Sequence, residues 1–327
     1  MSIHNESQYL TRSIESILDQ TYGNFEFIIV DDGSTDLSKN IVLSFKDKRI
    51  QLLINKSRQG LSRSLNKAID KSNGIYIARM DGDDISEPNR FEIQLEIMER
   101  NLDVAVCGTW IRSLSGDIIS EWKPPIDSNR IKSYLVFENA ISHPTAMIRK
   151  KCLAEKNIKY PVEFGYAQDY ALWVSLSKYY PLANIDKKLL TYRLNTNGNT
   201  EKYNRFQRKY VNNIRLSQLE ELGILPSNKE FSLFCDFCDW RFMSNKEFIV
   251  TIEKFLCRMI DKNNRVEYCN KASFCEEISD RWFELCRSSF INGLWSYNTY
   301  SNSMLQIDNQ ISSVKKLKFI AKCFLNR

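Results

Sequence analysis

Glycine is scarce in this chain of 327 residues, which contains only 11 of them. Neither a G-x-G nor a G-K-[ST] sequence occurs anywhere, so the glycine-rich fingerprints of dinucleotide-binding domains and of P-loops are excluded. In those sites the backbone N–H groups of a glycine-rich loop hold the phosphates. A nucleotide bound by this chain must therefore be held by side chains and a metal ion.

Long apolar runs and basic tracts are also missing. No run approaches the roughly 20 residues needed to span a bilayer, and we find no signal peptide. Because no basic tract carries interleaved aromatic residues, we expect no nucleic-acid partner. The net charge of +6 is mild and suits anionic small molecules or an anionic membrane surface. With 43% hydrophobic and 26% charged residues, the composition is that of a globular protein with one large or two modest domains.

The cysteines number nine, which is an odd count for a disulfide framework. We expect reduced thiols and a cytoplasmic protein. Cys235 and Cys238 have the spacing of half a zinc site. The other cysteines form no second close pair and both histidines lie far upstream, so a structural zinc is not expected.

The first 110 residues alternate between helical and strand patterns. The apolar run Phe25–Val30 ends in Asp31-Asp32-Gly33-Ser34, and a second strand is expected at Ile50–Ile54. A third strand ends at Arg79. Such alternation predicts an α/β fold with a doubly wound, mainly parallel sheet and flanking helices, whose ligands bind at the carboxyl ends of strands. Helices are expected over residues 37–45, 61–69 and 88–100.

The rest of the chain reads differently. Residues 103–195 have mixed strand patterns with helices near 128–138 and from Gln168, and the sequence from about residue 200 is helical and rich in aromatic residues. We therefore expect an α/β ligand-binding and catalytic domain over residues 1–195 and a helical region over 196–327. Only Met1-Ser2-Ile3 precedes the polar residues 4–6, so the first strand is expected to be a truncated stub or to begin upstream.

The acidic sequence Asp81-Gly82-Asp83-Asp84 follows the third strand directly. Three carboxylates so close together repel one another unless a cation intervenes. A hard divalent metal ion that shares its oxygen ligands with a diphosphate would make such a cluster favourable. The alternative is a purely structural acidic turn before a helix.

Several sequences, in this order along the chain, resemble the motifs of family 2 glycosyltransferases with the GT-A fold. The resemblance covers roughly residues 1–195. It rests on residues 2–6 (SIHNE), 16–22 (SILDQTY), 25–36 (FEFIIVDDGSTD), 81–84 (DGDD) with Pro88 and Arg90, 142–145 (SHPT) and 168–173 (QDYALW).

The resemblance implies a nucleotide-sugar site in the first part of the chain. Asp32 matches the position that accepts a hydrogen bond from the uracil imide of a UDP-sugar. Ser2 and His4 match positions that line the base and the ribose, and Glu6 belongs to the same opening motif of the donor site. The alternative for Asp31 and Asp32 is formation of a turn and a helix cap.

The resemblance also implies a metal ion and a catalytic base. Asp83 matches the carboxylate that binds Mg²⁺ or Mn²⁺, and Asp81 the one near the ribose and the metal. Asp169 matches the carboxylate that deprotonates the acceptor hydroxyl, which gives inversion at the anomeric carbon. Its position at the start of an apolar helix favours the ionised form, although a helix-cap role is the alternative. Gln168 stands where glutamate is more common, and His143 is expected to line the site.

These implications predict a metal-dependent, inverting glycosyltransferase that uses a nucleotide-sugar, most readily a UDP-sugar. The expected acceptor is a saccharide or a lipid-linked saccharide of capsule, exopolysaccharide or O-antigen synthesis. A sugar-phosphate nucleotidyltransferase is the first alternative. Such an enzyme should carry a Gly- and Arg-rich N-terminal loop, which is absent from this sequence. A non-catalytic carbohydrate-binding relative is the second alternative. Such a protein would not need Asp83 and Asp169, and both residues are present here.

The sequence from Val314 to Leu325 has the pattern of a basic amphipathic helix. Such a helix lies on an anionic membrane face, here the inner face of the plasma membrane, or packs on its own domain with a solvated lysine edge. Both interpretations remain open at this point.

Overall fold

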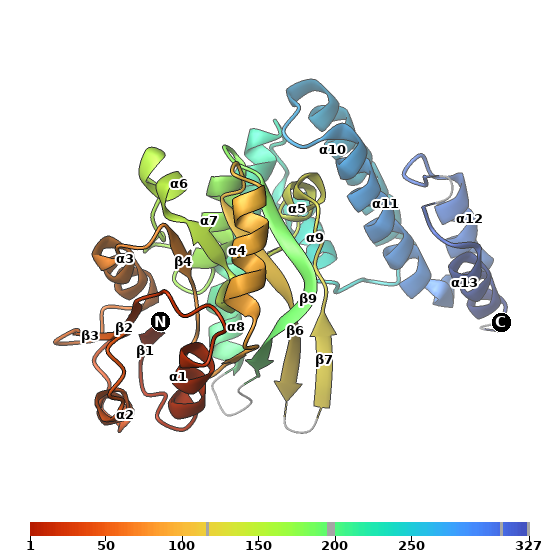
Figure 1. Cartoon of the computed structure of the whole chain (residues 1–327). Coiled ribbons are helices and arrows are strands. Elements are labelled where there is room, and N and C mark those ends of the chain that lie inside the picture. Colours follow the sequence, from red (N-terminus) through yellow and green to blue (C-terminus); the bar gives the residue numbers. More distant parts are fainter. Residues whose placement is uncertain (116–117, 195–199, 308–309, 326–327) are drawn as a thin grey trace. The chain divides into compact units, whose positions relative to one another are not determined.

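The computed structural model describes residues 1–115, 118–194, 200–307 and 310–325 (Figure 1). The chain divides into two compact units, residues 1–131 with 139–211 and residues 132–138 with 212–327. These units are defined by packing alone. The functional division into residues 1–195 and 196–327 stays a prediction.

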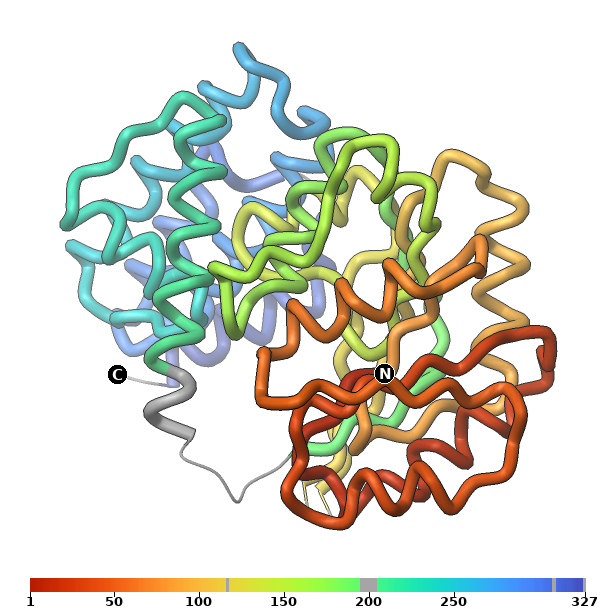
Figure 2. The backbone as a smooth tube through the Cα atoms, turned by 90° about the vertical axis from the view of Figure 1, so that its left-hand side faces the viewer, coloured from red at the N-terminus to blue at the C-terminus, as the bar shows by residue number. Residues whose placement is uncertain are grey.

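The first unit begins with a parallel sheet in the order β1 (Ser2–Ile3), β2 (Phe27–Asp31) and β3 (Ile50–Ile54). The apolar sequence of β2 explains why all five of its residues are buried. Asp31 pairs with Ile54, so the residues that follow these two strands meet at the same edge of the sheet. In Figure 2 the N-terminus lies among the red and orange segments of this part. The helices between the strands are α1 (Leu10–Leu18), α2 (Ser38–Ser44) and α3 (Leu61–Lys71).

A second sheet in the same unit has the order β4-β8-β6-β9-β5, with β7 beside β6. In the described ranges its one parallel pair is β6 with β9, and the other pairs are antiparallel. Parallel pairing is therefore less extensive than expected, because β4 pairs with β8 from the mixed region instead of extending the first sheet. The bounds are β4 (Tyr76–Ala78), β5 (Ile85–Ser86), β6 (Val106–Ser115), β7 (Ile118–Trp122), β8 (Met147–Arg149) and β9 (Leu182–Arg193).

Helix α4 (Arg90–Arg100) packs against β6 and β9 (Figure 1). Its buried polar side chains satisfy backbone carbonyl groups that the strands leave without partners. Gln94 donates hydrogen bonds to the carbonyl oxygens of Cys107 and Thr145 (2.6 and 2.8 Å). These bonds fix the helix on the sheet. The other helices of this region are α5 (Ser128–Tyr134), η1 (His143–Thr145), α6 (Lys150–Glu155) and α7 (Gln168–Ser177).

The second unit is helical, as expected. Its core is built mainly from aromatic and aliphatic side chains, and Phe137 packs against Phe234, Phe237 and Phe274 with ring centroids 5.9–6.3 Å apart. Helix α8 begins in the first unit and ends in the second. The helices are α8 (Thr200–Glu221), α9 (Asn228–Cys238), α10 (Lys246–Val266), α11 (Lys271–Ser288), η2 (Phe290–Asn292), α12 (Leu294–Asn302) and α13 (Ser313–Leu325).

The structure also bears on the membrane and cysteine expectations. Within the described ranges, no helix combines the length and the apolar composition that crossing a membrane requires. All nine cysteines are free thiols, Cys235 and Cys238 among them. In the part of the chain that the structure describes, no three His, Cys, Asp or Glu side chains come together in a way that could hold a metal ion.

Candidate functional site

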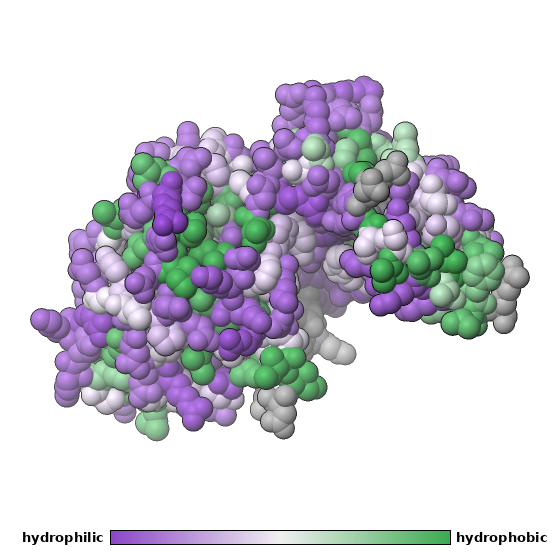
Figure 3. Space-filling model, turned by 45° about the vertical axis from the view of Figure 1, so that its right-hand side comes forward, coloured by the Kyte–Doolittle hydropathy of each residue, from purple (hydrophilic) through white to green (hydrophobic). Residues whose placement is uncertain are grey.

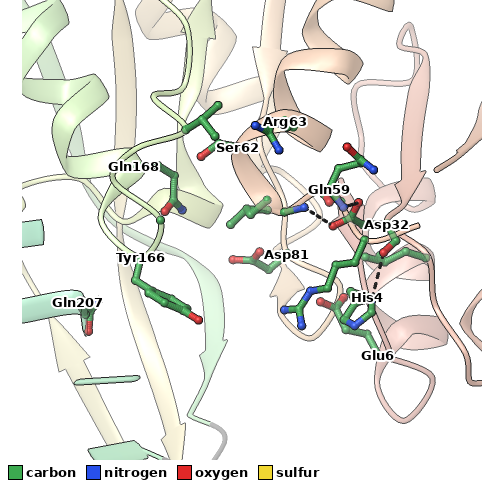
Figure 4. Close-up of a pocket in the computed structure, with 17 residues that line it drawn as sticks. His4, Glu6, Asp32, Gln59, Ser62, Arg63, Asp81, Tyr166, Gln168 and Gln207 are labelled. Atoms are coloured by element: carbon green, nitrogen blue, oxygen red, sulfur yellow. Dashed lines mark hydrogen bonds between the residues drawn. The ribbon is translucent and has the colours of Figure 1, made fainter. Parts of the chain in front are cut away.

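A cavity of about 550 Å³ in the first unit is the candidate site (Figure 4). This volume lies in the range of small-molecule sites. The structure brings together all five residues predicted to bind the donor, since each of them lines this cavity: Ser2, His4, Glu6, Asp32 and Asp81.

Asp32 forms a preorganised acceptor on one side of the cavity. Its Oδ1 accepts hydrogen bonds from Asn55 Nδ2 and from the Gln59 backbone N–H, each at 2.8 Å, and Oδ2 accepts one from the Gly60 N–H at 2.8 Å. Burial acts to raise the pKa of Asp32, but these donors outweigh it and hold the pKa below its usual value. Asp32 is therefore a firmly ionised carboxylate.

The sequence dictates this arrangement through strand ends and two glycines. Asp32 follows β2 and Asn55 follows β3, so the parallel register places their side chains next to each other. Gly33 has φ +74°, and a Cβ on it would lie 2.9 Å from the Arg58 nitrogen. Gly60 has φ +91°. These conformations let the 57–60 segment approach closely enough to donate to Asp32.

The acidic turn after β4 lies next to the same cavity. Asp81 forms an ion pair with Arg79, whose side chain is buried. Asp84 is buried and accepts a hydrogen bond from the Arg193 N–H at 2.9 Å, and Arg193 Nε donates to the Asp83 carbonyl at 3.2 Å. The turn is thus tied to the end of β9, and Asp84 has a structural role.

Two carboxyl groups around this turn, Glu6 and Asp84, have raised pKa values. Burial, followed by repulsion from Asp81 and Asp83, raises the pKa of Glu6 to about 8. The same three causes raise the pKa of Asp84. Oε2 of Glu6 is buried without a hydrogen-bond partner among the described residues. These shifts favour the protonated forms of Glu6 and Asp84, so full ionisation of the carboxylates around the turn would require additional positive charge.

Gly82 makes room for the Glu6 carboxylate. A Cβ at this position would lie 1.8 Å from Glu6 Oε2 and 3.1 Å from Ile3 Cγ2. Gly82 therefore admits a side chain from the opening motif, which brings Glu6 to the acidic turn.

The carboxylates of the turn could bind a divalent cation only if further ligands came from a bound substrate or from water. Carboxylate oxygens, such as those of Asp81 and Asp83, suit Mg²⁺ and Mn²⁺. Asp81 lines the cavity, whereas Asp83 does not occur among the described lining residues. The described residues bring together no three such side chains, so a cation bound here would need further ligands from a substrate or from water.

Asp169 stands in the first turn of α7, and its neighbour Gln168 lines the cavity. Asp169 itself is not among the described lining residues. Its Oδ2 accepts a hydrogen bond from Asn139 Nδ2 at 2.8 Å. Burial raises the pKa of Asp169, against the backbone N–H of Tyr170 and the charge of Arg79. A carboxylate with a raised pKa and a fixed orientation can act as a general base.

His143 packs beside this helix instead of lining the cavity. It is 9% exposed, its Nε2 lies 3.0 Å from the Tyr160 hydroxyl, and its ring contacts Trp173. Burial and the charge of Arg79 hold its pKa well below the usual value. His143 is therefore a neutral packing residue, and its expected place in the cavity lining is not observed among the described residues.

Sequence reasoning missed the residues that complete the cavity. Arg58, Arg63 and Tyr166 line it together with Gln168, which the 168–173 motif contains, and in Figure 4 Asp81 lies between Asp32 and Tyr166. The two arginines follow β3, so the rule that ligands bind at strand ends could have found them. Tyr166 belongs to no motif that we recognised.

Comparison with known proteins bears directly on the family. A sequence model described as glycosyl transferase family 2 matches residues 1–156. An uncharacterized glycosyltransferase from Haemophilus influenzae is 34% identical over 240 residues, which cover 68% of this chain and 73% of that protein. The O-antigen biosynthesis glycosyltransferase WbnJ from Escherichia coli is 36% identical over 215 residues, which cover 62% and 80%.

Solved structures show the fold. S. aureus TarS 1–349 in complex with UDP-GlcNAc has a TM-score of 0.55 at 15% identity, covering 98% of this chain and 87% of TarS. The mannosyltransferase PcManGT from Pyrobaculum calidifontis, in complex with GDP-Man and Mn²⁺, also gives 0.55, at 12% identity and with 99% and 85% covered. Both support the expected GT-A fold. Together with the sequence relatives, they confirm the resemblance, and the chain is a glycosyltransferase that belongs to glycosyl transferase family 2.

Proposed function

We propose that this enzyme transfers a sugar from a UDP-sugar to a hydroxyl group of a saccharide or lipid-linked saccharide, with inversion at the anomeric carbon. One observation carries the proposal: a single cavity joins the preorganised Asp32 carboxylate to the acidic residue Asp81. The first is suited to an imide donor and the second to a cation on a diphosphate. TarS, which has the same fold, was crystallised with UDP-GlcNAc.

Recognition of the base falls to Asp32. A carboxylate oxygen has two lone pairs. The Asp32 carboxylate, which accepts hydrogen bonds from Asn55, Gln59 and Gly60 and has a further side-chain hydrogen bond with Ser64, is the acceptor that we propose for the uracil imide. His4 Nδ1 donates to the Asp32 carbonyl at 3.1 Å, which keeps the imidazole beside the expected position of the base. Ser2 and Glu6 complete this wall of the cavity.

The acidic turn serves the diphosphate. Asp83 and Asp81 would hold Mg²⁺ or Mn²⁺, and the ion when bound supplies positive charge to the leaving UDP. PcManGT, which shares the fold, was crystallised with Mn²⁺. Arg58 and Arg63 add two positive charges to the cavity. They attract the diphosphate and orient it without a glycine-rich loop.

Asp169 is the proposed catalytic base. The acceptor hydroxyl gives its proton to the Asp169 carboxylate while its oxygen bonds to the anomeric carbon, and the bond from that carbon to UDP breaks. Asn139 orients the carboxylate through its 2.8 Å hydrogen bond, and burial raises the pKa of Asp169. Both properties support this role.

The setting that we propose is the synthesis of a surface polysaccharide, such as capsule, exopolysaccharide or O antigen, at the cytoplasmic face of the plasma membrane. WbnJ, whose name assigns it to O-antigen biosynthesis, supports this setting. So does a basic helix at the end of the described chain.

UDP release from a panel of nucleotide-sugars, with and without saccharide acceptors, tests the proposal. We expect Asp169→Asn to retain donor binding in calorimetry and to lower the rate of transfer by about 10²–10⁴-fold. Asp103→Asn, at an exposed position of the first unit, is the matched control and should behave as wild type.

Three results would contradict the proposal. If Asp169→Asn transfers sugar at the wild-type rate, the base is another group. Release of pyrophosphate from UTP and a sugar phosphate would identify a nucleotidyltransferase. Donor or saccharide binding with no turnover under any condition would identify a non-catalytic relative.

A further inference from the structure

Helix α13 (Ser313–Leu325) carries two apolar stripes on different faces. One stripe is buried, since Phe319 and Cys323 are 0% exposed and belong to the core of the second unit. The other stripe is exposed to solvent, with Val314 at 59% and Leu317 at 65%. A helix that only covers its own core needs the first stripe alone.

The exposed stripe has the spacing of one helix face. Residues 314, 317, 321 and 324 are separated by three, four and three positions, so they lie above one another along the helix. They are Val, Leu, Ala and Phe, and the Phe324 side chain is 51% exposed. Leu325, beside them, is 85% exposed. The stripe therefore runs over the whole length of the helix.

Other segments of the second unit also expose apolar side chains. The short helix η2, which contacts α13, exposes Ile291 to 64%, and Met304 before α13 is 80% exposed. Figure 3 shows hydrophobic residues gathered on the right-hand side of the view, over the C-terminal helices. An apolar surface of this kind on a soluble domain marks an interaction site.

The charge on the helix is of one sign. Residues 313–325 contain four lysines and no Asp or Glu. Lys315, Lys318 and Lys322 are exposed beside the apolar stripe, and Lys322 Nζ lies 5.5 Å from the ring centroid of Phe290. Lysine stems cover apolar surface while their ammonium groups reach towards anions.

We propose that the exposed face of α13, defined by Val314, Leu317, Phe324 and Leu325 with its flanking lysines, binds the surface of an anionic bilayer. The apolar side chains enter the boundary between headgroups and acyl chains, and the lysines contact the anionic headgroups. The inference deepens the proposed function, because a lipid-linked acceptor lies in such a surface.

Charge decides against a second copy of the chain as the occupant. Pairing two α13 helices through this stripe would place lysines opposite lysines, with no carboxylate on either helix to balance them. An anionic bilayer supplies the missing negative charge along the whole helix.

Flotation of the full-length protein with lipid vesicles tests the proposal. We expect binding to phosphatidylcholine vesicles that contain phosphatidylglycerol, weak binding to pure phosphatidylcholine, and loss of binding at high salt. Replacing both Lys315 and Lys318 by Gln should lower the partition coefficient by about fivefold per lysine. The double variant Val314→Ser/Leu317→Ser should lower it by about tenfold or more.

Matched controls separate this surface from a general loss of charge or hydrophobicity. Leu225→Ser removes an apolar side chain that is 83% exposed elsewhere in the second unit, and Lys254→Gln removes an exposed lysine. Both controls should bind vesicles as wild type does. Sugar transfer to a soluble acceptor is measured in parallel, so a failure of the proposed function shows there and not in the flotation.

Three results would overturn the proposal. In the first, the wild type binds neutral and anionic vesicles equally. In the second, Val314→Ser/Leu317→Ser binds vesicles as the wild type does. In the third, light scattering shows concentration-dependent self-association that the same double variant abolishes. Circular dichroism of the variants confirms that they are folded before any of these results is interpreted.

Discussion

Two acidic segments follow strands in the first unit, and their carboxylates are stabilised in opposite ways. Asp32 accepts hydrogen bonds from Asn55, Gln59 and Gly60, which hold its pKa below the usual value. Asp81, at the start of the other segment, pairs with the buried Arg79, and the pKa values of the neighbouring Glu6 and Asp84 are raised.

The difference indicates what each segment still needs from a ligand. The protein alone satisfies the charge of Asp32, so this residue can recognise a hydrogen-bond donor without rearrangement. Full ionisation of the carboxylates around the acidic turn would require additional positive charge, which favours a cation. We infer that base recognition is preformed, whereas the diphosphate site is completed only when the metal ion and the donor bind together.

The largest effect is expected from Asp32→Ala. This change removes a buried carboxylate that accepts three hydrogen bonds, and each hydrogen bond to a charged group contributes about 1.5–3 kcal/mol. With partial relaxation of the 57–60 segment, we expect the free energy of unfolding to fall by about 3 kcal/mol. Urea denaturation measures it. Asp103→Ala, at an exposed position, should change it by less than about 0.5 kcal/mol. An equal, small change in both variants would contradict the preformed site.

The second prediction concerns coupling between metal and nucleotide. At about 100 times its Kd, a ligand that binds only the folded state adds about 2.7 kcal/mol of stability. We expect UDP to raise the melting temperature of wild type more with Mn²⁺ than with EDTA. Asp83→Asn should lose the part that depends on Mn²⁺. Asp32→Asn should weaken the effect of UDP under both conditions.

Each variant of this pair is the control for the other. If Asp32→Asn removed the dependence on Mn²⁺ and Asp83→Asn left it intact, the roles of the two segments would be reversed. Differential scanning fluorimetry with UDP, Mn²⁺ and EDTA in all combinations distinguishes these cases.

A smaller effect is expected from Gly82→Ala. Its Cβ would meet Glu6 Oε2 at 1.8 Å, and such overpacking costs about 1–3 kcal/mol. Truncation of Glu6 removes the clash. In urea denaturation, the double variant Glu6→Ala/Gly82→Ala should therefore lose less free energy of unfolding than the two single variants lose when their losses are added. Strict additivity would show that Gly82 is not required by the Glu6 carboxylate.

The strand ends could be predicted from the sequence because their signals are local. The strand at Ile50–Ile54 has the predicted bounds, and Asp32 and Asp81 line the cavity as expected. The predictions for Asp32 and Asp81 depend on short apolar runs that are followed by acidic turns. Helix α4 was also expected, although it begins at Arg90, after Ser86 has joined β5.

The sheet pairing could not be predicted in the same way. Ala78 pairs with Met147, a residue far along the chain, and no pattern near either of them encodes this contact. The same is true of Tyr166, which reaches the cavity through the path of a loop and belongs to no motif. Asn139 was missed because its hydrogen bond to Asp169 depends on how two distant segments pack.

The smallest expected effect is a shift of the pH profile in Asn139→Ala. Asp169 can accept a proton only when it is ionised, so the rate of transfer should fall as the pH drops through its pKa, which burial raises above the usual value. Asn139 and Arg79 both oppose this rise, and Tyr160, whose own pKa is raised, stays neutral. Removing the Asn139 donor should therefore raise the pKa further and move the acid limb to higher pH.

We expect this shift to be less than about one pH unit, because one unit corresponds to 1.36 kcal/mol, the scale of a single hydrogen bond to a charged group. Asn101→Ala is the matched control, since its amide donates only to the carbonyl of Ile97 at an exposed site. An acid limb that stays in place in Asn139→Ala would mean that another group titrates. If the acid limb of the pH profile moves, the proton-accepting group lies on α7. This helix is outside both acidic segments, which we assign to the base and to the diphosphate.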